Sequence, residues 1–106
     1  MTGHSRGEMV LIVLGTARAL PGRREDLVAA AADIAAATRG DDGCLSYGFY
    51  AALDDADTIV SIETWRDQVA LDAHMSHPHT QQFIARVGDL LDGTPRMAFH
   101  HVPDPS

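Results

Sequence analysis

The sequence has one cysteine, few aromatic residues and only 8 basic side chains against 15 acidic ones. The single Cys44 excludes an intrachain disulfide, which is typical of proteins from a reducing compartment. The formal net charge of −7, without arginines interleaved with aromatics, opposes binding to the phosphates of nucleic acid. The apolar stretch at 9–17 is far too short to span a bilayer, and no signal for secretion precedes it. We therefore expect a cytoplasmic protein that binds neither nucleic acid nor membrane.

Motifs of several enzyme classes are also missing. The sequence has no GxGxxG or Walker loop, no GxSxG elbow and no CxxC pair. These absences argue against nucleotide and flavin cofactors, against a hydrolase serine and against a dithiol redox centre. Cys44 has no neighbouring cation or helix start that would lower its pKa, so we interpret it as a small buried hydrophobe.

The chain is close to the commonest size of a protein domain, with 106 residues and 45% hydrophobic side chains. We expect one domain over 1–106, with a folded core at about 9–102 and flexible ends at 1–8 and 103–106.

Hydrophobic spacing and turn residues predict six elements in the order β-α-β-β-α-β, and the second helix is expected to break near His77 into two segments. Strands are expected at 9–20, 43–53, 58–66 and 95–102, and helices at 21–40, 67–75 and 78–93. This order is typical of the ferredoxin-like α+β fold, in which helices cover one face of a four-stranded antiparallel sheet.

The predicted sheet has more apolar surface than its own helices can cover. The strand at 9–20 is apolar on both faces, and Val60 and Ile62 point away from the helices if Trp65 points toward them. Exposed apolar patches of this kind mark interfaces, and a second copy of the sheet is the simplest cover. We therefore expect a homodimer that forms through the free sheet face.

The stretch HMSHPH at 74–79 places three histidines within six residues. His74 and His77 have helical spacing, but Pro78 begins a new segment, so His79 need not converge on the same point. Asp72 is the only nearby acid on this helix, and no HExxH pattern occurs. We therefore predict no metal site here and interpret His77 as part of a solvated helix end.

His74 differs from its neighbours because it lies one helical turn after Leu71, at the border of the buried face. A space between helix and sheet should be lined there by Ser61, Glu63 and Trp65. An imidazole that titrates near neutrality beside an aromatic wall suits proton abstraction from a phenol or an enol. The alternative is that His74 is a satisfied, half-buried histidine and that Trp65 is ordinary core.

Other side chains are weaker candidates for the same space. His79 follows Pro78 in the first turn of the last helix, where the helix dipole keeps an imidazole neutral. Glu63 either orients His74 or lies at the solvent edge. Only one of Tyr47 and Tyr50 can face the space, and we assign Tyr50 to it. Leu71 and Phe83 are expected to complete an apolar, substrate-binding lining.

Two long segments, PGRREDLVAAAADIAAATRGDDGCLSYGFY and DDADTIVSIETWRDQVALDAHMSHPHTQQF, resemble the antibiotic biosynthesis monooxygenase (ABM) family. The resemblance covers about residues 9–102, and GCLSY, ETW with ALDAH behind it, and SHPHTQQF are its most specific parts. It implies ferredoxin-like domains whose sheets pack as dimers into a shared α-β barrel, with a pocket between the sheet and the helices of each copy.

The resemblance also implies an activity. Quinone-forming members oxidise polycyclic phenols with O2 and no metal, flavin or other prosthetic group, using an asparagine, a tryptophan and a tyrosine. Trp65 matches the tryptophan, whereas Ser61 and Leu71 stand at the other two positions. Haem-degrading relatives need a tryptophan where this chain has His74 and a histidine near Ile84, so haem degradation is not expected.

We therefore expect a cofactor-independent monooxygenase that oxidises a small hydroxylated aromatic or enolisable substrate with O2. His74, or failing it His79, would be the base, and Trp65 the aromatic wall. Two alternatives remain open. The domain could be a dimeric module that binds a small apolar ligand without catalysis, or an isomerase or lyase that uses the same base.

Overall fold

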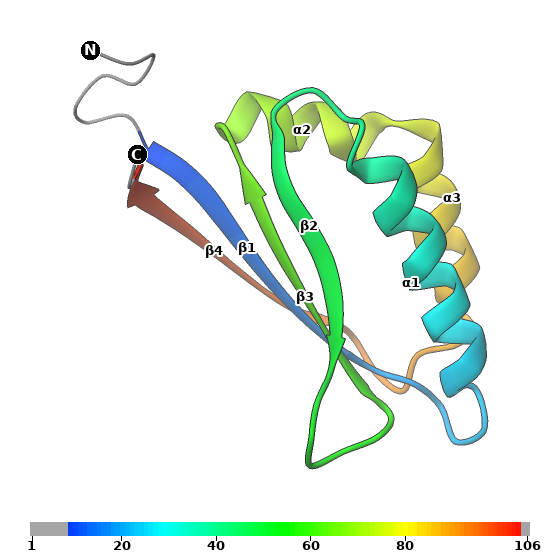
Figure 1. Ribbon diagram of the computed structural model, residues 1–106. Coiled ribbons are helices and arrows are strands. Elements are labelled where there is room, and N and C mark those ends of the chain that lie inside the picture. Colours follow the sequence, from blue (N-terminus) through cyan, green and yellow to red (C-terminus); the bar gives the residue numbers. More distant parts are fainter. Residues whose placement is uncertain (1–8, 105–106) are drawn as a thin grey trace.

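The computed structural model describes residues 9–104 as four strands and three helices (Figure 1). In chain order they are β1 (Met9–Arg18), α1 (Arg24–Thr38), β2 (Cys44–Ala51), β3 (Thr58–Trp65), α2 (Gln68–Ser76), α3 (Pro78–Val87) and β4 (Arg96–Pro103). The predicted order of elements is confirmed, including the split second helix. The flexible end predicted at 1–8 lies outside the described residues, whereas Pro103, expected in the other flexible end, belongs to β4.

The four strands form one antiparallel sheet in the order β2-β3-β1-β4. The apolar first strand therefore lies inside the sheet, with β3 on one side of it and β4 on the other. Its register places Val13 opposite Glu63 on β3 and opposite Phe99 on β4. The fold is ferredoxin-like, with all three helices on one side of the sheet (Figure 1).

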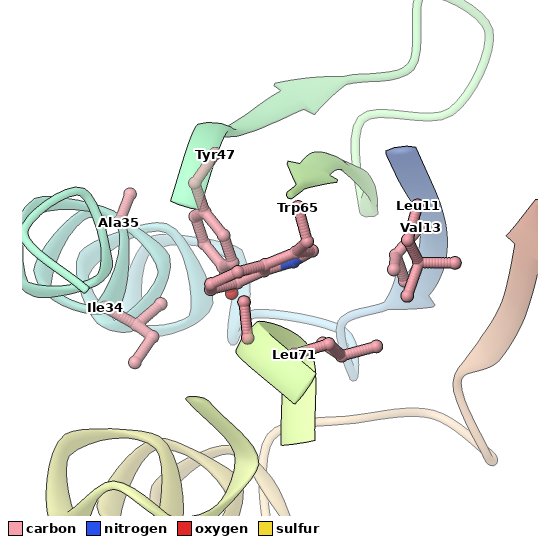
Figure 2. Packing of buried hydrophobic residues seen from close by; sticks show 8 residues of the cluster. Leu11, Val13, Ile34, Ala35, Tyr47, Trp65 and Leu71 are labelled. Atoms are coloured by element: carbon pink, nitrogen blue, oxygen red, sulfur yellow. The ribbon is translucent and has the colours of Figure 1, made fainter. Parts of the chain in front are cut away.

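Alternation along β3 decides which side chains meet the helices. Ile59, Ser61, Glu63 and Trp65 are buried, whereas Ile62 between them is 41% exposed. The faces that the period-2 pattern predicted are thus confirmed. Trp65 is fully buried at the centre of one core cluster, where Figure 2 shows it between Tyr47 of β2 and Leu71 of α2.

Local signals set the limits of the split helix. Asp67 caps α2, because its side chain accepts a 2.8 Å hydrogen bond from the backbone of Ala70. His77 ends α2 and precedes α3 with an extended backbone (φ −66°, ψ 144°), which suits a residue before proline. Pro78 is then in the first turn of α3, as predicted.

The third helix is shorter than the sequence predicted. It ends at Val87 instead of continuing to Gly93. The segment that follows binds to the end of β1: Leu90 accepts a 2.8 Å backbone hydrogen bond from Leu20, and Leu91 bridges to Ala19. Pairing with β1 therefore replaces the last helical turns. No helix within residues 9–104 has the length and apolarity to cross a bilayer.

The helices leave part of the sheet uncovered. On their own side of the sheet, Met97 and Phe99 of β4 are 50% and 55% exposed. On the opposite side, Leu14 and Ile62 are 38% and 41% exposed. Each face of the described sheet thus keeps apolar side chains that water reaches.

Candidate functional site

One carboxylate joins two of the three histidines of HMSHPH. The Oδ2 atom of Asp41 lies 2.9 Å from Nδ1 of His74 and 3.1 Å from Nε2 of His79. The side chains of Asp41 and His74 are only 7% and 4% exposed, whereas that of His79 is 31% exposed. The cluster is therefore closed around its carboxylate and reaches solvent through His79.

Three separate segments bring these groups together. Asp41 lies in the turn after α1, where its backbone bonds to Thr38 at 2.8 Å and to Cys44 at 3.1 Å. His74 is in the last turn of α2, and His79 is the second residue of α3. The break between α2 and α3 thus allows two histidines only five positions apart to approach one oxygen from different directions.

The histidines hold Asp41 in its ionised form. Burial alone would raise the pKa of Asp41, but the hydrogen bonds from His74 and His79 outweigh burial and lower it. A carboxylate has no proton to give at neutral pH, so the imidazole of His74 must donate from Nδ1. The Asp41 carboxylate therefore fixes the tautomer that carries its proton on Nδ1.

The ring of His74 packs among aromatic side chains. Its centroid lies 4.7 Å from that of Trp65 and 5.7 Å from that of Tyr47. Thr80 Oγ1 is 3.2 Å from the same Nδ1 that bonds to Asp41. Burial is the main reason that the pKa of His74 is lowered, while the bond to Asp41 opposes this shift. His74 is therefore a neutral imidazole at pH 7, with Nδ1 engaged and Nε2 left for another partner.

Glu63 is a second buried acid on the same side of the sheet. It is 5% exposed, and its Oε1 accepts a 3.0 Å hydrogen bond from Nε1 of Trp65. Burial raises the pKa of Glu63, and the bond from Trp65 only partly offsets this. Neither role that the sequence suggested for Glu63 holds, because it neither orients His74 nor lies at the solvent edge.

The other predicted site residues are distributed unevenly around this cluster. Ser61 and Leu71 are buried on the helix side, and Leu71 packs in the core cluster of Trp65. Assigning Tyr50 to the space beside Trp65 was wrong. Tyr47 occupies that position, at 6.4 Å between ring centroids, and Tyr50 is 56% exposed.

Two cavities flank α1. One of about 350 Å³ lies against β2 and is lined by Arg39, Phe49 and Tyr50, among others. The other, of about 220 Å³, lies against α3, and its lining includes His79 and Phe83. His74 and Trp65 line neither of these two cavities, whereas His79 lines the smaller one.

His77 lies at the edge of the cluster, as the sequence predicted for a residue of the helix break. Its side chain is 42% exposed, and its Nε2 is 3.9 Å from Oδ1 of Asp41, beyond hydrogen-bond distance. Its ring stacks on that of His79 at 5.0 Å. His77 is thus a solvated neighbour of the cluster.

Asp41 is the site residue that the sequence reasoning missed. It is 33 positions from His74 in the chain, and only the packing of the turn after α1 against α2 unites them. The available signal was the motif DDGC, in which Gly43 adopts a positive φ of 80° and so allows the tight turn that holds Asp41. The structure also corrects the premise that Asp72 is the acid to consider, since Asp41, His74 and His79 place one possible metal-ligand atom each within 4.8 Å of one another.

Comparison with known proteins places this chain in a family. Residues 10–86 match the family model described as antibiotic biosynthesis monooxygenase. An uncharacterised Synechocystis protein, sll1783, is 30% identical over 81 residues, which are 76% of this chain and 55% of that protein. Rv0793 of Mycobacterium tuberculosis, provisionally named a monooxygenase, is 43% identical over 54 residues, or 51% and 52% of the two chains. The chain thus spans about half the length of these two curated relatives.

The solved structures agree with the sequence matches. The structure of Rv0793 superposes with a TM-score of 0.82 at 31% identity, covering 86% of this chain and 92% of that one.

A third sequence relative, YcnE of Bacillus subtilis, also bears a provisional monooxygenase name and is 28% identical over 71 residues, or 67% and 75% of the two chains. The family model covers most of the described residues. The chain belongs to the antibiotic biosynthesis monooxygenase family.

Proposed function

We propose that this protein is a monooxygenase that oxidises a small hydroxylated aromatic or readily enolised substrate with O2, without a metal or an organic cofactor. One observation carries the proposal: a neutral His74, buried against Trp65, is held through Nδ1 by the Asp41 carboxylate. An imidazole fixed in this way has Nε2 as its free base, and a carboxylate behind it stabilises the cation that forms on proton uptake.

The reaction begins with transfer of the substrate's acidic proton to Nε2 of His74. The anion then gives one electron to O2, and the resulting substrate radical and superoxide combine to form a carbon–oxygen bond. Loss of water from the protonated peroxide leaves a carbonyl, so one oxygen atom enters the product and the other leaves as water. The substrate supplies the electrons, and the protein supplies the base and a surface that excludes water.

The proposed substrate class follows from the apolar surroundings of the base. Trp65 and Tyr47 form an aromatic wall beside His74, and Met97 and Phe99 are half-exposed on the same side of the sheet. An aromatic substrate that packs on Met97 and Phe99 would remove their apolar surface from water, whereas Trp65 and Tyr47 are already buried. His79, which lines the smaller cavity, is the second candidate for the base.

The proposed assembly is a homodimer through the sheet face opposite the helices. Leu14, Ile62 and Tyr50 of that face are each more than a third exposed. A second copy of the sheet packed on this face would cover them. Light scattering at micromolar concentration should give the mass of two chains, and the mass of one chain would contradict this assembly.

Oxygen uptake with a panel of hydroquinones and anthrones tests the activity. We expect stoichiometric O2 consumption, and a loss of about 10²–10⁴ in turnover for His74→Asn, the usual contribution of a general base. Asparagine keeps a donor near the position of Nδ1, so the bond to Asp41 is retained while Nε2 is lost. His77→Asn is the matched control and should be nearly silent in turnover. Equal, small effects of both substitutions would overturn the role of His74.

The same panel separates the alternatives. A module that only binds a ligand would give saturable binding, for example by quenching of Trp65 fluorescence, with no O2 uptake. An isomerase or lyase would convert substrate under nitrogen as fast as in air, and His74→Asn would abolish that conversion. A monooxygenase requires O2 for every turnover.

A further inference from the structure

We propose that Asp41, His74 and His79 form a binding site for a divalent first-row transition metal such as Zn²⁺, and that metal bound there blocks His74 as a base. The site itself stands on geometry alone. Only its effect on the base depends on the proposed function.

The ligand set and its convergence support the site. Two imidazole nitrogens and one carboxylate oxygen are the donors that Zn²⁺, Co²⁺ and Fe²⁺ accept, and they lie within 4.8 Å of one another. The three donors come from a turn and two helices, so backbone packing holds each of them in place. Because Asp41 and His74 are almost fully buried, little ordering would be required of them on metal binding.

The distances fit coordination after a small expansion. In a tetrahedral site with metal–ligand bonds of about 2.0–2.1 Å, neighbouring donor atoms lie roughly 3.3 Å apart. Asp41 Oδ2 is now 2.9 Å from Nδ1 of His74 and 3.1 Å from Nε2 of His79. Asp41 Oδ2 needs to separate from each nitrogen by only a few tenths of an ångström, while the two nitrogens, which lie within 4.8 Å of each other, need to settle at a similar spacing. His79, the exposed member, gives a route by which the ion can enter and leaves room for water as a further ligand.

The consequence for the base follows from the chemistry of imidazole. A neutral imidazole has one N–H and one lone pair. In the metal-free protein, His74 carries the proton on Nδ1 and offers the lone pair of Nε2. When Nδ1 gives its lone pair to a metal, the proton must lie on Nε2, which then donates and cannot accept. His74 therefore cannot bind a metal through Nδ1 and accept a substrate proton on Nε2 at the same time.

The test uses the whole 106-residue chain, purified without a metal-affinity step and treated with a chelator. Calorimetric titration with Zn²⁺ should show one ion per chain, and Co²⁺ should give the intense visible bands of a tetrahedral site. His79→Asn removes Nε2 from a partly exposed position without disturbing the core. It should weaken Zn²⁺ binding at least about tenfold, the least that even an outer-sphere group contributes to a metal site. His100→Asn, an exposed histidine on β4, is the matched control and should bind as tightly as the parent.

Absence of stoichiometric binding, or an unchanged Zn²⁺ affinity in His79→Asn, would overturn the site. A protein that binds Zn²⁺ but oxidises no substrate would retain the site and lose the proposed function. Where turnover is found, one equivalent of Zn²⁺ should inhibit the parent, and His79→Asn should require at least about tenfold more. Full activity at saturating Zn²⁺ would refute the blocking of His74.

Discussion

Replacement of Asp41 by asparagine tests the cluster most directly, because it removes one charge and almost no volume. The carboxylate accepts bonds of 2.9 Å and 3.1 Å from His74 and His79. A hydrogen bond to a charged group contributes about 1.5–3 kcal/mol and a neutral one about 0.5–1.5. The substitution turns both charged hydrogen bonds into neutral ones. The bond from buried His74 should lose the whole difference between these two contributions, and the bond from His79, which is 31% exposed, should lose less. We therefore expect a loss of about 1–2 kcal/mol in the free energy of unfolding.

For a domain of this size such a loss lowers Tm by roughly 5–15 °C. Asp42→Asn is the matched control, since Asp42 is the next residue and its side chain is 92% exposed. Its 3.4 Å contacts with Arg66 are those of a surface ion pair, so Asp42→Asn should change stability by less than about 0.5 kcal/mol. Thermal melts followed by circular dichroism measure both variants, and equal Tm values would refute the reasoning.

The same pair of variants reports on the proton of His74. The amide introduced by Asp41→Asn can donate as well as accept, so it no longer forces the Nδ1-protonated tautomer. Nitrogen-15 NMR of the imidazoles should show that tautomer in the parent and in Asp42→Asn, and a mixture in Asp41→Asn. If His74 is the base, turnover should fall in proportion to the loss of the Nδ1-protonated tautomer. An unchanged NMR spectrum in Asp41→Asn would show that Asp41 does not position His74.

Three further substitutions test other parts of the structure. Glu63→Gln keeps an acceptor for Trp65 but carries no charge. Burial raises the pKa of Glu63 above 4.5, so ionisation costs the parent no stability below that pH but an increasing amount as the pH rises through the folded-state pKa. The Tm values of parent and variant should therefore agree at pH 4, and Glu63→Gln should have the higher Tm at pH 8. Thr38→Val should raise Tm by a few degrees, since Oγ1 of Thr38 is buried without a hydrogen-bond partner among the described residues and removing it saves about 1 kcal/mol. The hydrogen bond from Arg18 is the main cause that lowers the pKa of Asp55 to about 2, so carbon-13 NMR of its carboxyl should show a higher titration midpoint in Arg18→Gln.

The fold was predictable because local patterns and global packing agree along most of the chain. Alternation along β3 indicated the buried face, and Asp67 and Pro78 indicated the limits of the split helix. The predicted end of α3 was wrong, because the chain after Val87 forms hydrogen bonds with the end of the first strand instead of continuing the helix. Propensity along the segment does not report that competition.

The site was only partly predictable, because its chemistry depends on contacts between distant segments. The alternation of β2 separates Tyr47 from Tyr50, but the choice between them needs the register that sets Tyr47 opposite Glu63. A bulge between Cys44 and Ser46 shifts that register. Period-2 spacing within one strand does not reveal the register in which two strands pair.

The partner of His74 was beyond reach for a related reason. Spacing of i, i+4 makes contacts within one helix readable from sequence, so it reveals only an acid on the helix that carries His74. Asp41 instead arrives from the turn after α1, and its usefulness depends on burial that no spacing rule describes. His74 and Trp65 were found because a helix face and a strand face each carry their own period.

The buried Asp41 carboxylate links the two proposals, since its charge must be balanced in one of two ways. Two N–H groups can point at it, at the 2.9 Å and 3.1 Å distances of the described structure, and the neutral imidazole of His74 then keeps a lone pair on its far side. A cation can instead lie between the carboxylate and the imidazoles, and the lone pairs then turn inward. A ligand that binds only the folded state stabilises it by RT ln(1 + [L]/Kd), about 2.7 kcal/mol at a hundredfold excess over Kd. The arrangement that makes His74 a base is therefore also the one that a metal ion, given sufficient affinity, would convert into a more stable and inactive form.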